Sequence, residues 1–239
     1  MGWRKYYLDA TLVPLGFTIN MAYHAWLWHK VRVQPLSTII GTNASGRRNW
    51  VSAIMKENDK KNILGVQSFR NLIMGSTLMA TTSMLLSTGL AAILSSTYSV
   101  KQPLKDTIFG GRGEFMVEFK YVTLLTIFLF SFFCHSLSIK FVNEVGILIN
   151  SPQDSTSIVI TPGYVSELLE KGFLLNTVGN RLFYTAMPLL LWIFGPVPVF
   201  LCYGIMVPVF YNLDFVARDG KVKADGNDDT EIEMEIVDA

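Results

Sequence analysis

The nineteen residues YVTLLTIFLFSFFCHSLSI run from Tyr121 to Ile139 without a charge and lie between Lys120 and Lys140. An α-helix needs about 20 predominantly apolar residues to cross the hydrocarbon core of a bilayer. The length of this run and the charged residues at its two ends therefore predict a membrane-spanning helix.

Three more uncharged, apolar runs lie on either side of this one, at residues 12–28, 72–94 and 182–213. Half of all residues are hydrophobic and 16% are charged, whereas soluble domains carry about 25% charged residues. We therefore expect an all-α, polytopic protein localised in a membrane, with about four transmembrane helices within residues 1–215.

The last run is longer than a single straight span requires, because its thirty-two residues would form a helix of about 48 Å. Proline removes a helical N–H and kinks or breaks a helix. The run contains Pro188, Gly195, Pro196, Pro198 and Pro208. We predict one span that is strongly kinked by proline. The alternative is a broken span, with two helical pieces joined at residues 195–198.

Two segments outside the spans have distinct patterns. In the first, at about residues 43–70, four apolar residues recur at helical spacing, namely Trp50, Val51, Ile54 and Met55. This amphipathic helix lies either on the membrane surface or against the rest of the protein. The second segment, residues 216–239, is acidic and is predicted to be a disordered, solvated tail.

Lys and Arg residues indicate the orientation, because short basic loops stay in the cytosol. Eight of them lie in residues 29–70, which we therefore place in the cytosol. With four spans, both termini then lie on the opposite side of the membrane. If the last run is instead a hairpin, the tail lies in the cytosol. The totals for the two sides are eleven against nine, so the contrast is small.

The sequence contains no P-loop, no nucleophile elbow and no zinc-protease motif, so we expect no enzyme and no cofactor. No metal-binding motif is present either. The net charge of +1 argues against a nucleic-acid partner. His24 and His135 are each expected to hydrogen-bond a neighbouring helix or to lie near the membrane interface; a haem, a metal or a proton relay is the less favoured alternative.

The second span carries many small and hydroxyl side chains. Ser76, Ala80, Ser83 and Ser87 share one helical face, and Thr77, Thr81 and Thr88 form an adjacent stripe. Small residues allow helices to approach closely, and their hydroxyls bond across the contact. Alternatively, hydroxyls line a hydrated pore and replace part of an ion's water shell. Packing is the favoured alternative.

Carboxylates at the ends of the spans are the second set of pore candidates: Glu114, Glu118, Asp9 and Asp214. A ring of such carboxylates from several subunits would attract divalent cations. For each residue the alternative is a salt bridge with a nearby base. Glu118, for example, has Lys120 and Arg181 as candidate partners.

Several motifs, taken in order, resemble the plant "domain of unknown function 599" membrane proteins over about residues 6–215. They are Tyr7-Leu8-Asp9, Leu12-Val13-Pro14, Tyr23-His24, Ile40-Gly41-Thr42-Asn43, Val66-Gln67-Ser68-Phe69-Arg70-Asn71, Phe132-Phe133-Cys134-His135, Gly179-Asn180-Arg181, Trp192-Ile193-Phe194-Gly195-Pro196 and Asp214. The family resemblance implies a calcium-permeable cation channel, because one member forms such a channel, a pentamer of the endoplasmic reticulum that acts in plant immune signalling.

The resulting hypothesis is a homo-oligomeric cation channel with a central pore, Ca²⁺ as the permeant ion, and further copies of itself and the lipid bilayer as partners. Four helices of one chain enclose too little space for a hydrated path, whereas a symmetric ring encloses one on its axis. The alternative is a non-conducting membrane scaffold that recruits partners through its loops and tail.

Overall fold

The computed structural model describes residues 3–56, 61–99, 114–150 and 160–216. Within these ranges the chain is helical and forms no strand, which confirms the all-α prediction. The helices are α1 (Trp3–Val33), η1 (Pro35–Ser37), α2 (Ile39–Lys56), α3 (Lys61–Ser99), α4 (Glu114–Ile149), α5 (Pro162–Leu190), η2 (Leu191–Ile193) and α6 (Pro196–Asp214).

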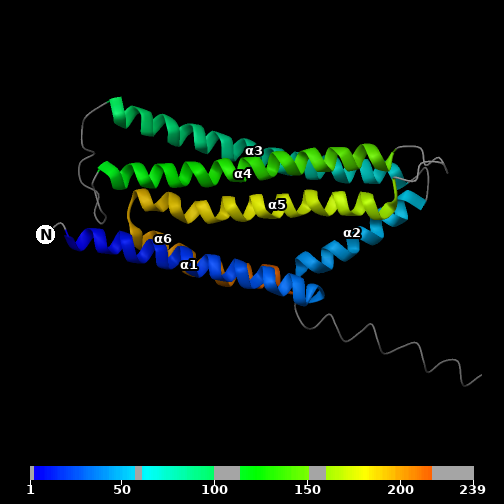
Figure 1. The fold of residues 1–239 in the computed structure, drawn as a ribbon, viewed down its shortest axis with the longest axis horizontal. Helices are drawn as coiled ribbons and strands as arrows, with labels where there is room; N and C mark the ends of the chain where they lie inside the picture. Colours follow the sequence, from blue (N-terminus) through cyan, green and yellow to red (C-terminus); the bar gives the residue numbers. More distant parts are fainter. Residues whose placement is uncertain (1–2, 57–60, 100–113, 151–159, 217–239) are drawn as a thin grey trace, which may run out of the picture.

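The long helices form two groups (Figure 1). α3, α4 and α5 lie side by side with α4 in the middle, and α1 pairs with α6. This pair lies against the side of α5 that faces away from α4. Leu124 and Phe128 of α4 are fully buried in the core, together with Val199 and Tyr203 of α6. The pair is therefore joined to the three-helix group by a shared core.

Three helical segments are long and apolar enough to cross a bilayer: Ile63–Ser96, Met116–Ile149 and Pro196–Asp214. Large apolar side chains such as Leu78, Phe133 and Ile205 are exposed on these helices, as expected for surfaces that face lipid. The chain is thus an all-α, polytopic membrane protein. The first predicted span, residues 12–28, lies within α1, which is not one of these three segments.

The predicted single kinked span at residues 182–213 is wrong, and the broken alternative is right. α5 ends at Leu190, the chain turns through η2, and Pro196 begins α6. Gly195 has a positive φ (φ 158°, ψ 169°), a backbone conformation that glycine adopts readily and that residues with a Cβ rarely adopt. Proline also suits the first helical position, because the N–H that it lacks would have no partner there. α6 therefore starts as a separate helix antiparallel to α5 (Figure 1).

Splitting this run reverses the chain direction once more and changes the predicted side of the tail. α6 ends beside the start of α2, where the backbones of Phe215 and Thr38 are paired. The chain at Val216 therefore lies on the side of residues 29–70, as the hairpin alternative predicts, and the prediction that both termini share a side is wrong. The count of Lys and Arg becomes fourteen against six. The basic side is thus better defined than the sequence alone indicated.

The helix predicted at residues 43–70 packs against the protein rather than standing alone on a membrane surface. Val51, Ile54 and Met55 of α2 are buried against α3, α4 and α5. Arg47 of α2 forms a bidentate ion pair with Glu170 of α5 at 2.8 and 2.9 Å. This settles the open alternative in favour of packing.

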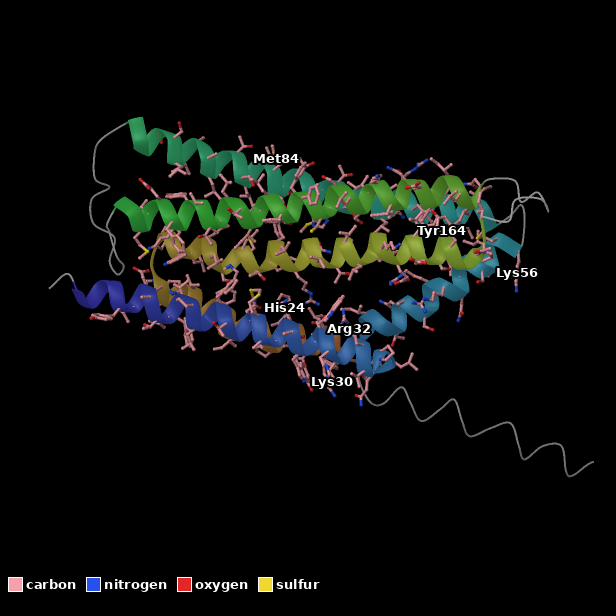
Figure 2. All side chains as sticks on the ribbon, viewed as in Figure 1. His24, Lys30, Arg32, Lys56, Met84 and Tyr164 are labelled. Atoms are coloured by element: carbon pink, nitrogen blue, oxygen red, sulfur yellow. The ribbon has the colours of Figure 1, made fainter. Side chains whose placement is uncertain are left out.

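α2 and the adjoining ends of α3, α4 and α5 extend beyond the end of α6 (Figure 1). Lys56 and Tyr164 lie at the far end of this extension, well past Lys30 and Arg32 of α1 (Figure 2). α3 has 39 residues and measures about 58 Å, against about 30 Å for the hydrocarbon core. A bilayer that α3 crosses upright would therefore leave this extension outside its hydrocarbon core. The predicted acidic tail, apart from Val216, lies outside the described residues.

Candidate functional site

The serine face of α3 is directed into the subunit. Ser76, Ser83 and Ser87 are at most 4% exposed. The Ser83 hydroxyl donates to Ser131 Oγ of α4 at 3.2 Å, and Ser131 in turn donates to the Gly179 carbonyl of α5 at 2.9 Å. These bonds tie three helices together, so this face has the role of packing.

The neighbouring threonine stripe of α3 is directed outward. Thr77, Thr81 and Thr88 are exposed, although each lies within a few residues of a buried serine. Thr88 Oγ1 donates to the Met84 carbonyl of its own helix at 2.9 Å. α3 therefore has two hydroxyl-rich faces, and the described part of the chain covers only the serine face.

Asp9 lies at the end of the molecule where α5 turns into α6, and it is 1% exposed. Its Oδ1 accepts a hydrogen bond from Trp192 Nε1 at 2.8 Å and lies 3.5 Å from Lys120 Nζ. Lys120 also donates to the Trp192 carbonyl at 3.2 Å. This ion pair connects α1, α4 and η2 inside the core.

Asp214, at the end of α6, forms the second buried ion pair. One carboxylate oxygen accepts a hydrogen bond from Arg181 Nη2, and the other accepts from the Tyr23 hydroxyl at 2.6 Å. The Arg181 guanidinium also lies over the ring of Phe210, 4.7 Å from its centre. The burial and pairing of Asp9 and Asp214 favour the salt-bridge alternative for both.

Glu114 and Glu118 belong to the first turns of α4, near the end of α3. Glu118 is half-buried. Lys120 and Arg181, its candidate partners, pair instead with Asp9 and Asp214. The placement of the Glu114 side chain is outside the described residues. Glu118 is therefore the carboxylate for which a pore role keeps most support.

The structure does not bring the histidines together as ligands. His24 of α1 packs against Phe210 of α6, whereas His135 of α4 packs against Gly179 of α5. Among the residues that the structure describes, no group of three or more His, Cys, Asp or Glu side chains is placed to hold a metal ion.

Residues 11–219 match the protein family described as "Protein of unknown function, DUF599". The chain belongs to the DUF599 family. The matched region contains every candidate residue above except Asp9. The resemblance to DUF599 proteins is thereby confirmed, while the family description assigns no activity. No curated protein and no solved structure matches the chain.

Proposed function

We propose that this chain forms a homo-oligomeric, calcium-permeable cation channel with its pore between the subunits. The observation that carries the proposal is the exposed threonine stripe of α3. A hydroxyl gains little from facing hydrocarbon, whereas one that faces water can replace part of the hydration shell of an ion. We assign Thr77 and Thr81 to the wall of this pore.

The described interior of one subunit offers no comparable path. Leu124 and Phe128 of α4 are fully buried, and Ser76 and Ser83 of α3 are bonded to neighbouring helices. The buried carboxylates are paired with bases. A hydrated route therefore needs several copies arranged around an axis, and closed cyclic symmetry provides such an axis.

Carboxylates near one end of α3 support a preference for divalent cations. α4 begins beside the end of α3, and Glu114 and Glu118 lie one helical turn apart on it. In a ring of subunits, these side chains would form a layer of negative charge at one mouth of the pore. We propose Ca²⁺ as the ion that this layer attracts.

The likeness to one DUF599 protein supports the cellular setting. The chain is similar in length and span number to WeiTsing, a pentameric calcium-permeable channel of the plant endoplasmic reticulum that acts in immunity. A pentamer in the reticulum with a role in plant defence is therefore part of the proposal.

The test is single-channel recording of the purified protein in planar bilayers with Ca²⁺ on one side. The double variant Thr77→Val and Thr81→Val removes two hydroxyls at almost constant volume, and we expect it to lower the unitary conductance several-fold. Thr126→Val is the matched control, because Thr126 is an exposed threonine on α4. Absence of Ca²⁺ current from an intact oligomer, or an equal effect of the control, would overturn the proposal.

The scaffold alternative predicts a different particle. Here the threonine stripe would contact lipid or a partner helix, and the purified protein would carry no current. A monomer in mild detergent and in lipid nanodiscs, measured by light scattering, would favour the scaffold over the channel.

A further inference from the structure

Two pairs of polar side chains face each other where α1 meets α5. Asn20 and His24 are one helical turn apart on α1, and Arg181 and Thr185 are one turn apart on α5. Asn20 Nδ2 donates to Thr185 Oγ1 at 3.1 Å. α6 closes this junction, because Tyr203 donates its hydroxyl to the Thr185 carbonyl at 2.8 Å. We call these residues the α1–α5 junction.

Three buried polar atoms of the α1–α5 junction have no hydrogen-bond partner within the described chain: Asn20 Oδ1, His24 Nε2 and Arg181 Nη1. Asn20 is completely buried. Leaving such an atom without a hydrogen bond destabilises the closed arrangement. Because three such atoms lie in the α1–α5 junction, its closed form is destabilised. A ligand that formed hydrogen bonds with all three atoms would stabilise the junction.

The chemistry of the three atoms identifies that ligand. His24 Nδ1 lies 2.7 Å from the Asn20 carbonyl oxygen, which can only accept, so Nδ1 carries the proton. In the neutral ring, Nε2 is then an acceptor. Asn20 Oδ1 is an acceptor as well, whereas Arg181 Nη1 is a donor. An anion cannot satisfy two acceptors, and a cation is repelled by the guanidinium. Water donates two hydrogen bonds and accepts others, which fits this set.

We propose that the α1–α5 junction is a water-binding site within the membrane, filled when the α1–α6 pair moves slightly away from α5. The movement is needed because the three atoms are inaccessible in the closed arrangement. Arg181 provides the entry, since its side chain is 20% exposed. This site lies inside each subunit and is separate from the proposed pore. Its test therefore does not depend on whether the protein is a channel.

His135 provides a matched comparison. It is fully buried, and neither ring nitrogen makes a hydrogen bond of normal geometry in the described chain, although the Asn176 side chain lies close to the ring. The helices around it cannot separate easily, because Ser131 and Ser138 of α4 donate to α5 carbonyls on either side, at 2.9 and 2.8 Å. A Cβ on Gly179 would lie 2.8 Å from the His135 ring. We expect this second site to stay dry.

Radiolytic labelling in ¹⁸O-enriched water tests the proposal on the full chain in lipid nanodiscs, because bound water labels the side chains that it touches. We expect His24 to be labelled several-fold faster than His135. The variant Asn20→Leu, which removes one acceptor, should lower labelling of His24. Equal slow labelling of both histidines in protein with an unchanged thermal midpoint would overturn the proposal.

Should Asn20→Leu fail to fold, the wild-type comparison of the two histidines decides alone. A structure of the protein in lipid, at a resolution that shows ordered water, gives a second readout. Density for water bonded to His24 Nε2 would support the site, and a dry, closed junction in every class of particle would contradict it.

Discussion

Ser76 and Thr77 are neighbours in the sequence, yet they lie in opposite surroundings. The Ser76 hydroxyl is buried and donates to Asn176 Oδ1 of α5 at 3.1 Å, while Thr77 is exposed. The same contrast holds for the rest of α3 and for the ion pairs. Polar groups inside the subunit bind its helices together, whereas polar groups on its outer surface are available to water, ions or a further copy.

The largest effect should come from breaking an inner ion pair. Asp214→Ala leaves the half-buried Arg181 guanidinium without its carboxylate, and Tyr23 loses its acceptor. We expect the free energy of unfolding to fall by about 3–5 kcal/mol. Chemical unfolding in detergent micelles, followed by tryptophan fluorescence, measures this loss.

The double variant Asp214→Leu with Arg181→Met is the control for that experiment. Replacing both charges with apolar side chains of similar size should restore much of the stability. A double variant as unstable as Asp214→Ala would show that the loss does not arise from an unpaired charge.

The two faces of α3 can be compared directly by the same substitution on each. Ser83→Leu forces a larger side chain into the contact with α4 and should lower the free energy of unfolding by about 1–3 kcal/mol. Thr81→Leu adds the side chain to the outer surface and should change it by less than about 0.5 kcal/mol. Similar losses for both variants, measured as above, would contradict the assignment of an inner and an outer face.

The smallest effect is expected for an ion pair on the outer surface. Glu167 and Lys171 of α5 lie 2.8 Å apart, and both side chains are more than half exposed. The hydrogen bond from Lys171 lowers the pKa of Glu167 and Glu167 raises that of Lys171. The ion pair could therefore stabilise the fold only at a pH above the lowered pKa of Glu167, and solvent screens the attraction between the two charges at that pH.

We accordingly expect Glu167→Gln to leave the thermal midpoint unchanged at neutral and at acidic pH. Glu170→Gln is the matched comparison, because Glu170 holds α2 through its bidentate pair with Arg47. This variant should lower the midpoint. A clear loss for Glu167→Gln at neutral pH alone would show that the outer pair contributes more than its exposure indicates.

Local sequence patterns predicted the helical membrane fold and both stripes of α3. The length of the run at 121–139 was sufficient for a span, and the spacing of Ser83 and Thr81 placed them on separate faces. Spacing does not reveal which face meets another helix, because that depends on neighbours distant in the sequence. The apolar residues of α2 were likewise predicted to share a face, but their docking on α5 was not.

The break at Gly195 and the ion pairs were the features that sequence patterns left undecided. Proline is compatible with a kink and with a break, and the packing of α6 on α1, with α6 antiparallel to α5, selects the break. Asp9 precedes the first apolar run and Lys120 precedes the third. The sequence therefore does not indicate that they pair, and the contact forms only when the helices assemble. A lone charge at the end of an apolar run was the available signal, and it indicates that a partner is needed without identifying it.

The extension of α3, α4 and α5 beyond the bilayer has a consequence for ion permeation. The excess length of α3 over the hydrocarbon core is about 28 Å, and electrostatic screening at physiological ionic strength acts over about 8 Å. An ion leaving a pore that followed α3 to Lys61, where α3 begins in the extension, would meet bulk electrolyte beyond the reach of head-group charge. Its local concentration at that exit would be set by the side chains of the protein, so changes in lipid composition should leave the current almost unaffected from that side.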